Sequence, residues 1–218
     1  MSTNWNQIRS RLFDWDNPMM RVLTRIFDLI LLNVLFAVCC IPVVTIGPSL
    51  SAMYTITLKM ARNEESHIIR EFFKAFRENF RQAVLFGVTA TAFFGFLVVD
   101  LFLLRGAGKN MNIIKIICYA AGILGYLICL YAFPLTARFV YTSKEVFHNA
   151  VLMSMIHLPQ TALMVLLNIP FIYLALYSGV SFMMVLWFML IFGFALMAYI
   201  QSLIFRKIFD KYERKVYE

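Results

Sequence analysis

Five polar side chains stand inside apolar stretches of this 218-residue chain, where a group that hydrogen-bonds or titrates is a candidate for function. His157 and Gln160 lie three residues apart around Pro159. They either face one cavity or satisfy the backbone carbonyls that the proline leaves free, and we favour the second interpretation. The other three are the amides of Asn33, Asn168 and Gln201.

Motifs of common enzymes and metal sites do not occur in the sequence. It contains no G-x-S-x-G, no H-E-x-x-H and no pair of carboxylates within an apolar stretch. Its four cysteines lie in apolar runs without C-x-x-C spacing, which argues against a zinc site or a disulfide framework. We therefore expect no enzymatic activity, no catalytic residue, no metal and no cofactor.

The composition indicates a membrane protein. Hydrophobic residues make up 61% of the chain and charged residues 15%, against about half and about a quarter in soluble domains. The net charge of +8 comes from basic residues that flank apolar stretches, so we expect contact with the lipid bilayer and none with nucleic acid. The predicted fold is a single all-α domain, a bundle of about six transmembrane helices with one amphipathic helix at the membrane interface.

A break divides the first apolar stretch into a helical hairpin at residues 26–61. No charged residue occurs between Leu29 and Leu58, which is longer than the about 20 residues that one span needs. Pro42, Gly47 and Pro48 place the turn, and we expect Gly47 to adopt a positive φ and Pro48 to open the second helix.

Residues 64–82 read as the interfacial amphipathic helix, because apolar and charged residues fall on opposite arcs at 100° per residue. Its phenylalanines are expected to enter the lipid. The charged arc either orients the neighbouring spans or binds a cytoplasmic partner. The candidate docking face consists of Arg70, Lys74, Arg77 and Arg81.

The other segments follow from charge and hydropathy. We expect a basic amphipathic segment at residues 1–25, four spans at 83–205 kinked at Pro159 and Pro170, and a basic tail at 206–218. Small residues every four positions from Ala83 to Gly95 predict close helix packing. A six-span arrangement places 17 of the 20 Lys and Arg residues on one side, which predicts a multi-pass cell-membrane protein with both termini in the cytoplasm.

Three stretches carry a family resemblance: LN at 32–33, IPVVTIGPSLSAMY at 41–54 and FFKAFRENFRQA at 72–83. Together they resemble the YesL family of bacterial membrane proteins. The resemblance implies a small helical membrane protein of Gram-positive bacteria, often encoded near carbohydrate importers, with no established activity. Its motif residues here are Asn33, Pro42, Thr45, Gly47, Pro48, Ala52, Phe73, Phe76, Asn79, Phe80 and Gln82.

Two functions stay open. The first is a non-enzymatic accessory protein of a carbohydrate-uptake system, with importer components as partners. The alternative is a small transporter or permease-like component, in which the backbone of residues 42–48 lines a substrate path instead of only shaping a turn. Permeases that couple to an ATPase carry a cytoplasmic loop with a glycine followed by I-x-L-P; Ile156, Leu158 and Pro159 match only its end. We therefore favour the accessory protein. No oligomeric state follows from the sequence.

Overall fold

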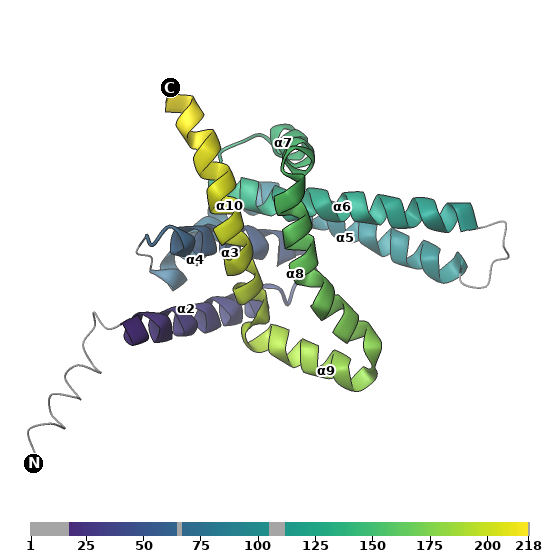
Figure 1. The fold of residues 1–218 in the computed structure, drawn as a ribbon, viewed down its shortest axis with the longest axis horizontal. Helices are drawn as coiled ribbons and strands as arrows, with labels where there is room; N and C mark the ends of the chain where they lie inside the picture. The colour runs from purple at the N-terminus through teal and green to yellow at the C-terminus, as the bar shows by residue number, and fades with distance from the viewer. Residues whose placement is uncertain (1–17, 65–66, 105–111, 218) are drawn as a thin grey trace, which may run out of the picture.

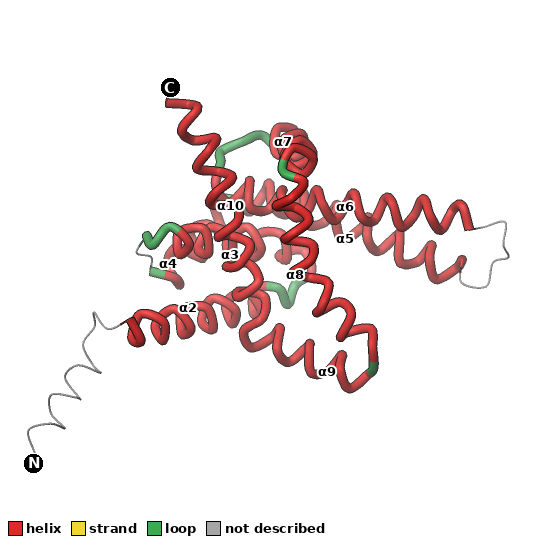
Figure 2. The backbone as a smooth tube through the Cα atoms, in the orientation of Figure 1, coloured by secondary structure: helices red, strands yellow, loops and turns green. Residues whose placement is uncertain are grey.

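A computed structural model describes residues 18–64, 67–104 and 112–217, which form helices joined by short links (Figures 1 and 2). These residues contain no strand, so the predicted all-α fold class is confirmed. Five segments are long and apolar enough to cross a membrane by length and composition. They are α2 (Pro18–Cys39), α5 (Phe80–Leu103), α6 (Asn112–Arg138), α8 (Leu158–Tyr177) and the stretch Gly179–Tyr212.

The chain turns within the predicted hairpin. After α2 ends at Cys39, a 3₁₀ turn η1 (Val43–Thr45) leads into α3 (Ile46–Ala61). Pro48 lies in the first turn of α3, where backbone N–H groups have no acceptor within the helix, so a residue without an N–H is tolerated. Helix α2 begins at Pro18, earlier than the predicted residue 26. Most of the predicted surface segment, residues 1–17, lies outside the described residues.

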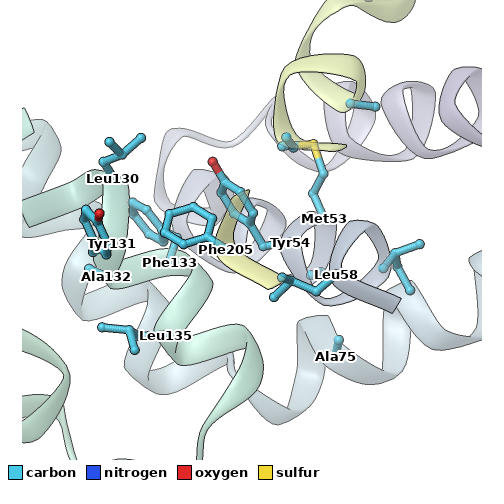
Figure 3. Packing of buried hydrophobic residues seen from close by; sticks show 14 of the residues in the cluster. Met53, Tyr54, Leu58, Ala75, Leu130, Tyr131, Ala132, Phe133, Leu135 and Phe205 are labelled. Carbon is cyan, nitrogen blue, oxygen red and sulfur yellow. The ribbon is translucent and has the colours of Figure 1, made fainter. Parts of the chain in front are cut away.

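Helix α3 forms the centre of the molecule. Twelve of its 16 residues are buried, and at 1.5 Å per residue it is about 24 Å long, shorter than the about 30 Å core of a bilayer. Its partners include α6 and α10 (Phe194–Tyr217). Figure 3 shows Phe205 of α10 among aromatic rings of α3 and α6; its centroid lies 6.3 Å from that of Tyr54 and 5.2 Å from that of Tyr131. The apolar stretch predicted as the second span is thus a short helix that other helices surround.

Two short helices interrupt the long ones. They are α4 (Ile68–Glu78) and α7 (Ser143–Ile156). The predicted kink at Pro159 is instead a complete break, because α7 ends before His157 and α8 begins at Leu158, whereas Pro170 lies inside α8. In Figure 1, α7 is seen end-on while α8 lies across the view.

A capping box at Thr142 and Glu145 explains where α7 begins. The backbone N–H of Thr142 donates to Glu145 Oε2 at 2.7 Å, and the backbone N–H of Glu145 donates to Thr142 Oγ1 at 3.5 Å. The Thr142 N–H, followed by its hydroxyl, lowers the pKa of Glu145. This cap fixes the start of a helix that the sequence analysis had merged with the following span.

The last two helices are joined without a loop. A π-helical turn η4 (Met189–Gly193) connects α9 (Gly179–Phe188) to α10. Helix α10 runs on through Tyr217, into the segment predicted as a tail, and Phe205, Ile208 and Phe209 are buried. Figure 1 shows α5 and α6 side by side, with α8 and α10 running across their direction.

Candidate functional site

The predicted docking face is exposed at every position. Arg70, Lys74 and Arg77 lie on α4, and Arg81 lies in the first turn of α5. Lys74 Nζ lies 4.0 Å from Glu78 Oε1, and both side chains are more than 60% exposed, so this pair holds the lysine only weakly. The face therefore offers cations to a partner or to an anionic surface.

The opposite side of α4 packs into the protein. Phe72 is fully buried, and Ile68 and Ala75 are buried beside it in the core that α4 shares with α2 and α3. The prediction that the phenylalanines of this helix enter lipid is wrong at Phe72, because α2 and α3 cover it. Ile69 and Phe73 stay 52% and 41% exposed. Core packing thus fixes the rotation of α4 and with it the direction of its basic face.

Two further motif phenylalanines, Phe76 and Phe80, lie between the buried and the exposed sides of this region. Phe76 is partly buried and packs against the core, with its ring stacked on that of Phe72 at a centroid distance of 6.3 Å. Phe80 is 37% exposed and already belongs to α5. The aromatic row along α4 therefore continues from the core to the surface.

The motif amides Asn79 and Gln82 stand where α4 passes into α5. The predicted helix over 64–82 ends at Glu78, and Asn79 separates it from α5. Gln82 Nε2 donates to the backbone oxygen of Tyr141 at 2.9 Å, in the link between α6 and α7. This bond ties the start of α5 to the end of α6, so its role is to position the two helices.

Thr45 closes the turn between α2 and α3. Its hydroxyl is placed to donate to the backbone oxygens of Cys39, at 2.5 Å, and Pro42, at 2.7 Å. These contacts satisfy carbonyls left free where α2 ends. The side chains around them, Ile41, Val43 and Val44, are 52–79% exposed and apolar. The exposed side chains of this turn therefore form a mainly apolar surface.

Gly47 is needed for close approach and not for its backbone conformation. The expected positive φ is wrong, because none of the described glycines has one. A Cβ on Gly47 would lie 2.0 Å from the backbone oxygen of Ala83 and 3.0 Å from Gly87 Cα. Helices α3 and α5 therefore touch backbone to backbone, as the small-residue spacing of α5 predicts for Ala83 and Gly87. Pro48 and Ala52 are buried along the same helix.

Asn33 holds the π-helical turn η4. Its side chain is fully buried on α2, and its Nδ2 donates to the backbone oxygens of Met189, at 3.0 Å, and Leu190, at 2.6 Å. Its Oδ1 accepts from the backbone N–H of Ala195 at 2.9 Å. The carboxamide thus supplies partners to backbone groups where the helix changes from the π-helical to the α-helical hydrogen-bond pattern. This contact spans more than 150 residues, and no sequence pattern signals it.

His157 and Asn168 have hydrogen-bond partners within the protein. His157 is buried, and its Nε2 lies 3.1 Å from Tyr212 Oη on α10. Burial, followed by the charge of Lys211, lowers the pKa of His157, which lies just outside α8. Asn168 Nδ2 donates to Met164 O in its own helix at 2.7 Å.

The carbonyls at the α7–α8 break are satisfied by a residue that the sequence analysis did not single out. Thr161 Oγ1 is placed to donate to the backbone oxygens of His157, at 2.9 Å, and Ser154, at 3.2 Å. Its oxygen also lies 2.7 Å from Tyr131 Oη. Gln160 Oε1 is buried without a hydrogen-bond partner among the described residues. We favoured His157 and Gln160 as the residues that satisfy the carbonyls freed near Pro159, but Thr161 has this role.

A row of polar contacts between α3 and α10 was also missed. Tyr54 Oη donates to Gln201 Oε1 at 2.5 Å, and the hydroxyls of Thr57 and Ser202 lie 2.8 Å apart, all buried. Towards the ends of the helices, Arg62 pairs with Asp210 at 2.7 Å, and Arg206 Nη1 donates to Ala61 O at 2.7 Å. Of these residues, the sequence analysis had marked only Gln201. The row pairs buried polar groups with one another, which secures α10 on α3.

No group of three or more His, Cys, Asp or Glu side chains in the described part of the chain is placed to hold a metal ion.

Comparison with known families places a domain on the first half of the chain. Residues 29–101 match the family model described as "Protein of unknown function, DUF624". This range contains α3, α4, half of α2 and most of α5, and with them every motif residue from Asn33 to Gln82. Comparisons with curated proteins and with solved structures gave no match.

Proposed function

We propose that this protein is a non-enzymatic membrane accessory protein of the YesL family that serves carbohydrate uptake and binds a cytoplasmic partner through α4. The exposed basic face carries this proposal. Phe72 and its neighbours anchor α4 in the core, so Arg70, Lys74 and Arg77 point outward in a fixed direction. A preformed charged surface lowers the ordering cost of binding.

A shared side for the basic segments supports the cytoplasmic assignment. Contacts link the basic segments to one another. These segments are the first part of α2, the region from the end of α3 to the start of α5, the link between α6 and α7, and the end of α10. The links are Arg25 to Asn63 at 3.2 Å, Lys59 to Glu71 at 2.7 Å, Arg62 to Asp210 at 2.7 Å, Gln82 to Tyr141 and His157 to Tyr212. We infer that this side faces the cytoplasm. A reporter active only there should work when fused at residue 64 or after residue 218, and fail at residue 109.

The alternative of a small transporter has less support. Three of the grooves described on the surface are lined almost wholly by apolar side chains. A sugar path needs hydrogen-bonding groups free to exchange partners, whereas Tyr54, Thr57 and Gln201 are bonded within the protein.

Charge reversal on α4 tests the proposal. The variant carries Arg70→Glu, Lys74→Glu and Arg77→Glu, and a control with two charge reversals instead of three carries Lys207→Glu and Lys211→Glu on the exposed side of α10. Crosslinked complexes and growth on complex sugars should fall only in the α4 variant, with protein level and topology unchanged in both. A second variant with Gln at residues 70, 74 and 77 removes the positive charges without adding negative ones. It separates the loss of attraction to the partner from new repulsion.

Unchanged crosslinked partners in the α4 variant would refute the docking role. An equal loss in the α10 control would show that the effect comes from net charge, since each cation near an anionic membrane contributes only about 1 kcal/mol.

A further inference from the structure

A groove between α5 and α6 runs along the two helices and is apolar over most of its length. Its volume is about 420 Å³, within the about 300–1,000 Å³ of small-molecule sites. Phe86, Ala90 and Phe93 of α5 form one wall, and Leu124, Gly125 and Ile128 of α6 form the other. Both helices are candidate spans, so the groove lies where lipid chains would surround the protein.

The groove continues into a hollow beside the start of α7. Phe86, Thr89 and Phe147 line both spaces. The hollow adds Leu85 from α5 and Ser143 and Lys144 from the first turn of α7. An apolar trough thus ends at a primary amine, and we call this end the mouth.

Positive charge gathers at the mouth. Lys144 is exposed and makes no ion pair within the described residues, and the carboxylate of the adjacent Glu145 accepts the Thr142 N–H of the capping box. Arg81 precedes Leu85 by one helical turn on the same face of α5. The bond from Gln82 to Tyr141 O braces this end of the groove.

We propose that the groove binds one anionic phospholipid of the surrounding membrane, with an acyl chain between α5 and α6 and the phosphate at Lys144 and Arg81. A long apolar trough with cations at one end matches an amphiphile with one charged end. An extended peptide would leave most of its backbone unpaired there, because the walls of the groove are helices with mainly apolar side chains. This proposal is independent of partner binding by Arg70, Lys74 and Arg77 of α4, although Arg81 belongs to both surfaces.

Lipid retention by the purified full-length protein tests the proposal. The detergent-solubilised protein is mixed with equal amounts of phosphatidylglycerol and phosphatidylethanolamine, and bound lipids are counted by native mass spectrometry. Thr89→Phe fills the neck shared by groove and mouth, and Ala121→Leu narrows the groove from α6. Val88→Phe adds the same ring at an exposed neighbouring position that lines neither space.

We expect one retained phosphatidylglycerol in the native protein and in Val88→Phe, and its loss in Thr89→Phe and Ala121→Leu. Lys144→Gln should lower the preference for phosphatidylglycerol about fivefold, the change that corresponds to about 1 kcal/mol for one interfacial cation. Lys207→Gln, an equal charge change on α10, should not. Circular dichroism and gel filtration check that each variant is folded.

Three results would overturn the proposal. Equal retention of both lipids would remove the role of the cations, and retention in both groove-filling variants would place the lipid elsewhere. A dimer of this chain that Thr89→Phe dissociates, without loss of lipid, would assign the groove to a second copy.

Discussion

Replacing Asn33 by Leu should destabilise the junction of α9 and α10, because it removes three hydrogen bonds at a fully buried position. Side-chain hydrogen bonds in helical membrane proteins contribute on average about 0.6 kcal/mol each. Leu has the same number of side-chain heavy atoms as Asn but a larger volume, so overpacking at this buried position adds to the loss of these bonds. We expect a decrease of about 2 kcal/mol in the free energy of unfolding, and up to about 4 kcal/mol where backbone groups of η4 stay unpaired.

Asn168→Leu is the matched control for this prediction. Asn168 Nδ2 bonds only to Met164 O in its own helix, so its removal should cost less than about 1 kcal/mol. Unfolding in mixed micelles, titrated with a denaturing detergent and followed by circular dichroism, measures both variants. A loss in Asn33→Leu no larger than in Asn168→Leu would refute the assignment of Asn33 to η4.

Two more predictions follow from the packing and the charges. Gly47→Ala should lower the melting temperature in detergent strongly, since its Cβ would meet Ala83 O at 2.0 Å, whereas Gly95→Ala, with nothing within 4 Å, should leave it unchanged; equal effects would contradict the close contact. Stability should be full above about pH 6.5 and fall as pH drops through the lowered pKa of His157, because the unfolded state binds the proton more readily. His157→Gln should abolish this slope, and a slope that persists would assign it to another group.

Local sequence patterns predicted the features that depend on local chemistry. The apolar runs predicted helices, and the proline-rich turn predicted the end of α2. The capping box at Thr142 and Glu145 was also visible in the sequence and could have marked the start of α7. The apolar run continues across it to the next span, and hydropathy alone therefore merged α7 with α8.

The error at α4 has a physical cause that also applies to the buried residues of α3. Hydropathy measures whether a side chain leaves water, and it does not distinguish lipid from the protein interior. Phe72 and Ala52 satisfy the same pattern as the outward-facing Phe73, yet they are buried against other helices. The sequence thus predicted an apolar environment for these residues correctly, and only the tertiary structure assigns that environment to neighbouring helices.

The same limit applies to the polar residues, with a consequence for function. An amide or hydroxyl in an apolar segment must find a partner, but the sequence does not say whether that partner is a substrate or the protein. For Asn33, Tyr54 and Gln201 the partners lie about 150 residues away in the same chain. Because these groups already form hydrogen bonds within the chain, we infer that their role is structural. We expect binding at the basic face of α4 and at the cations of the mouth, which have no strong partners within the described part of the chain.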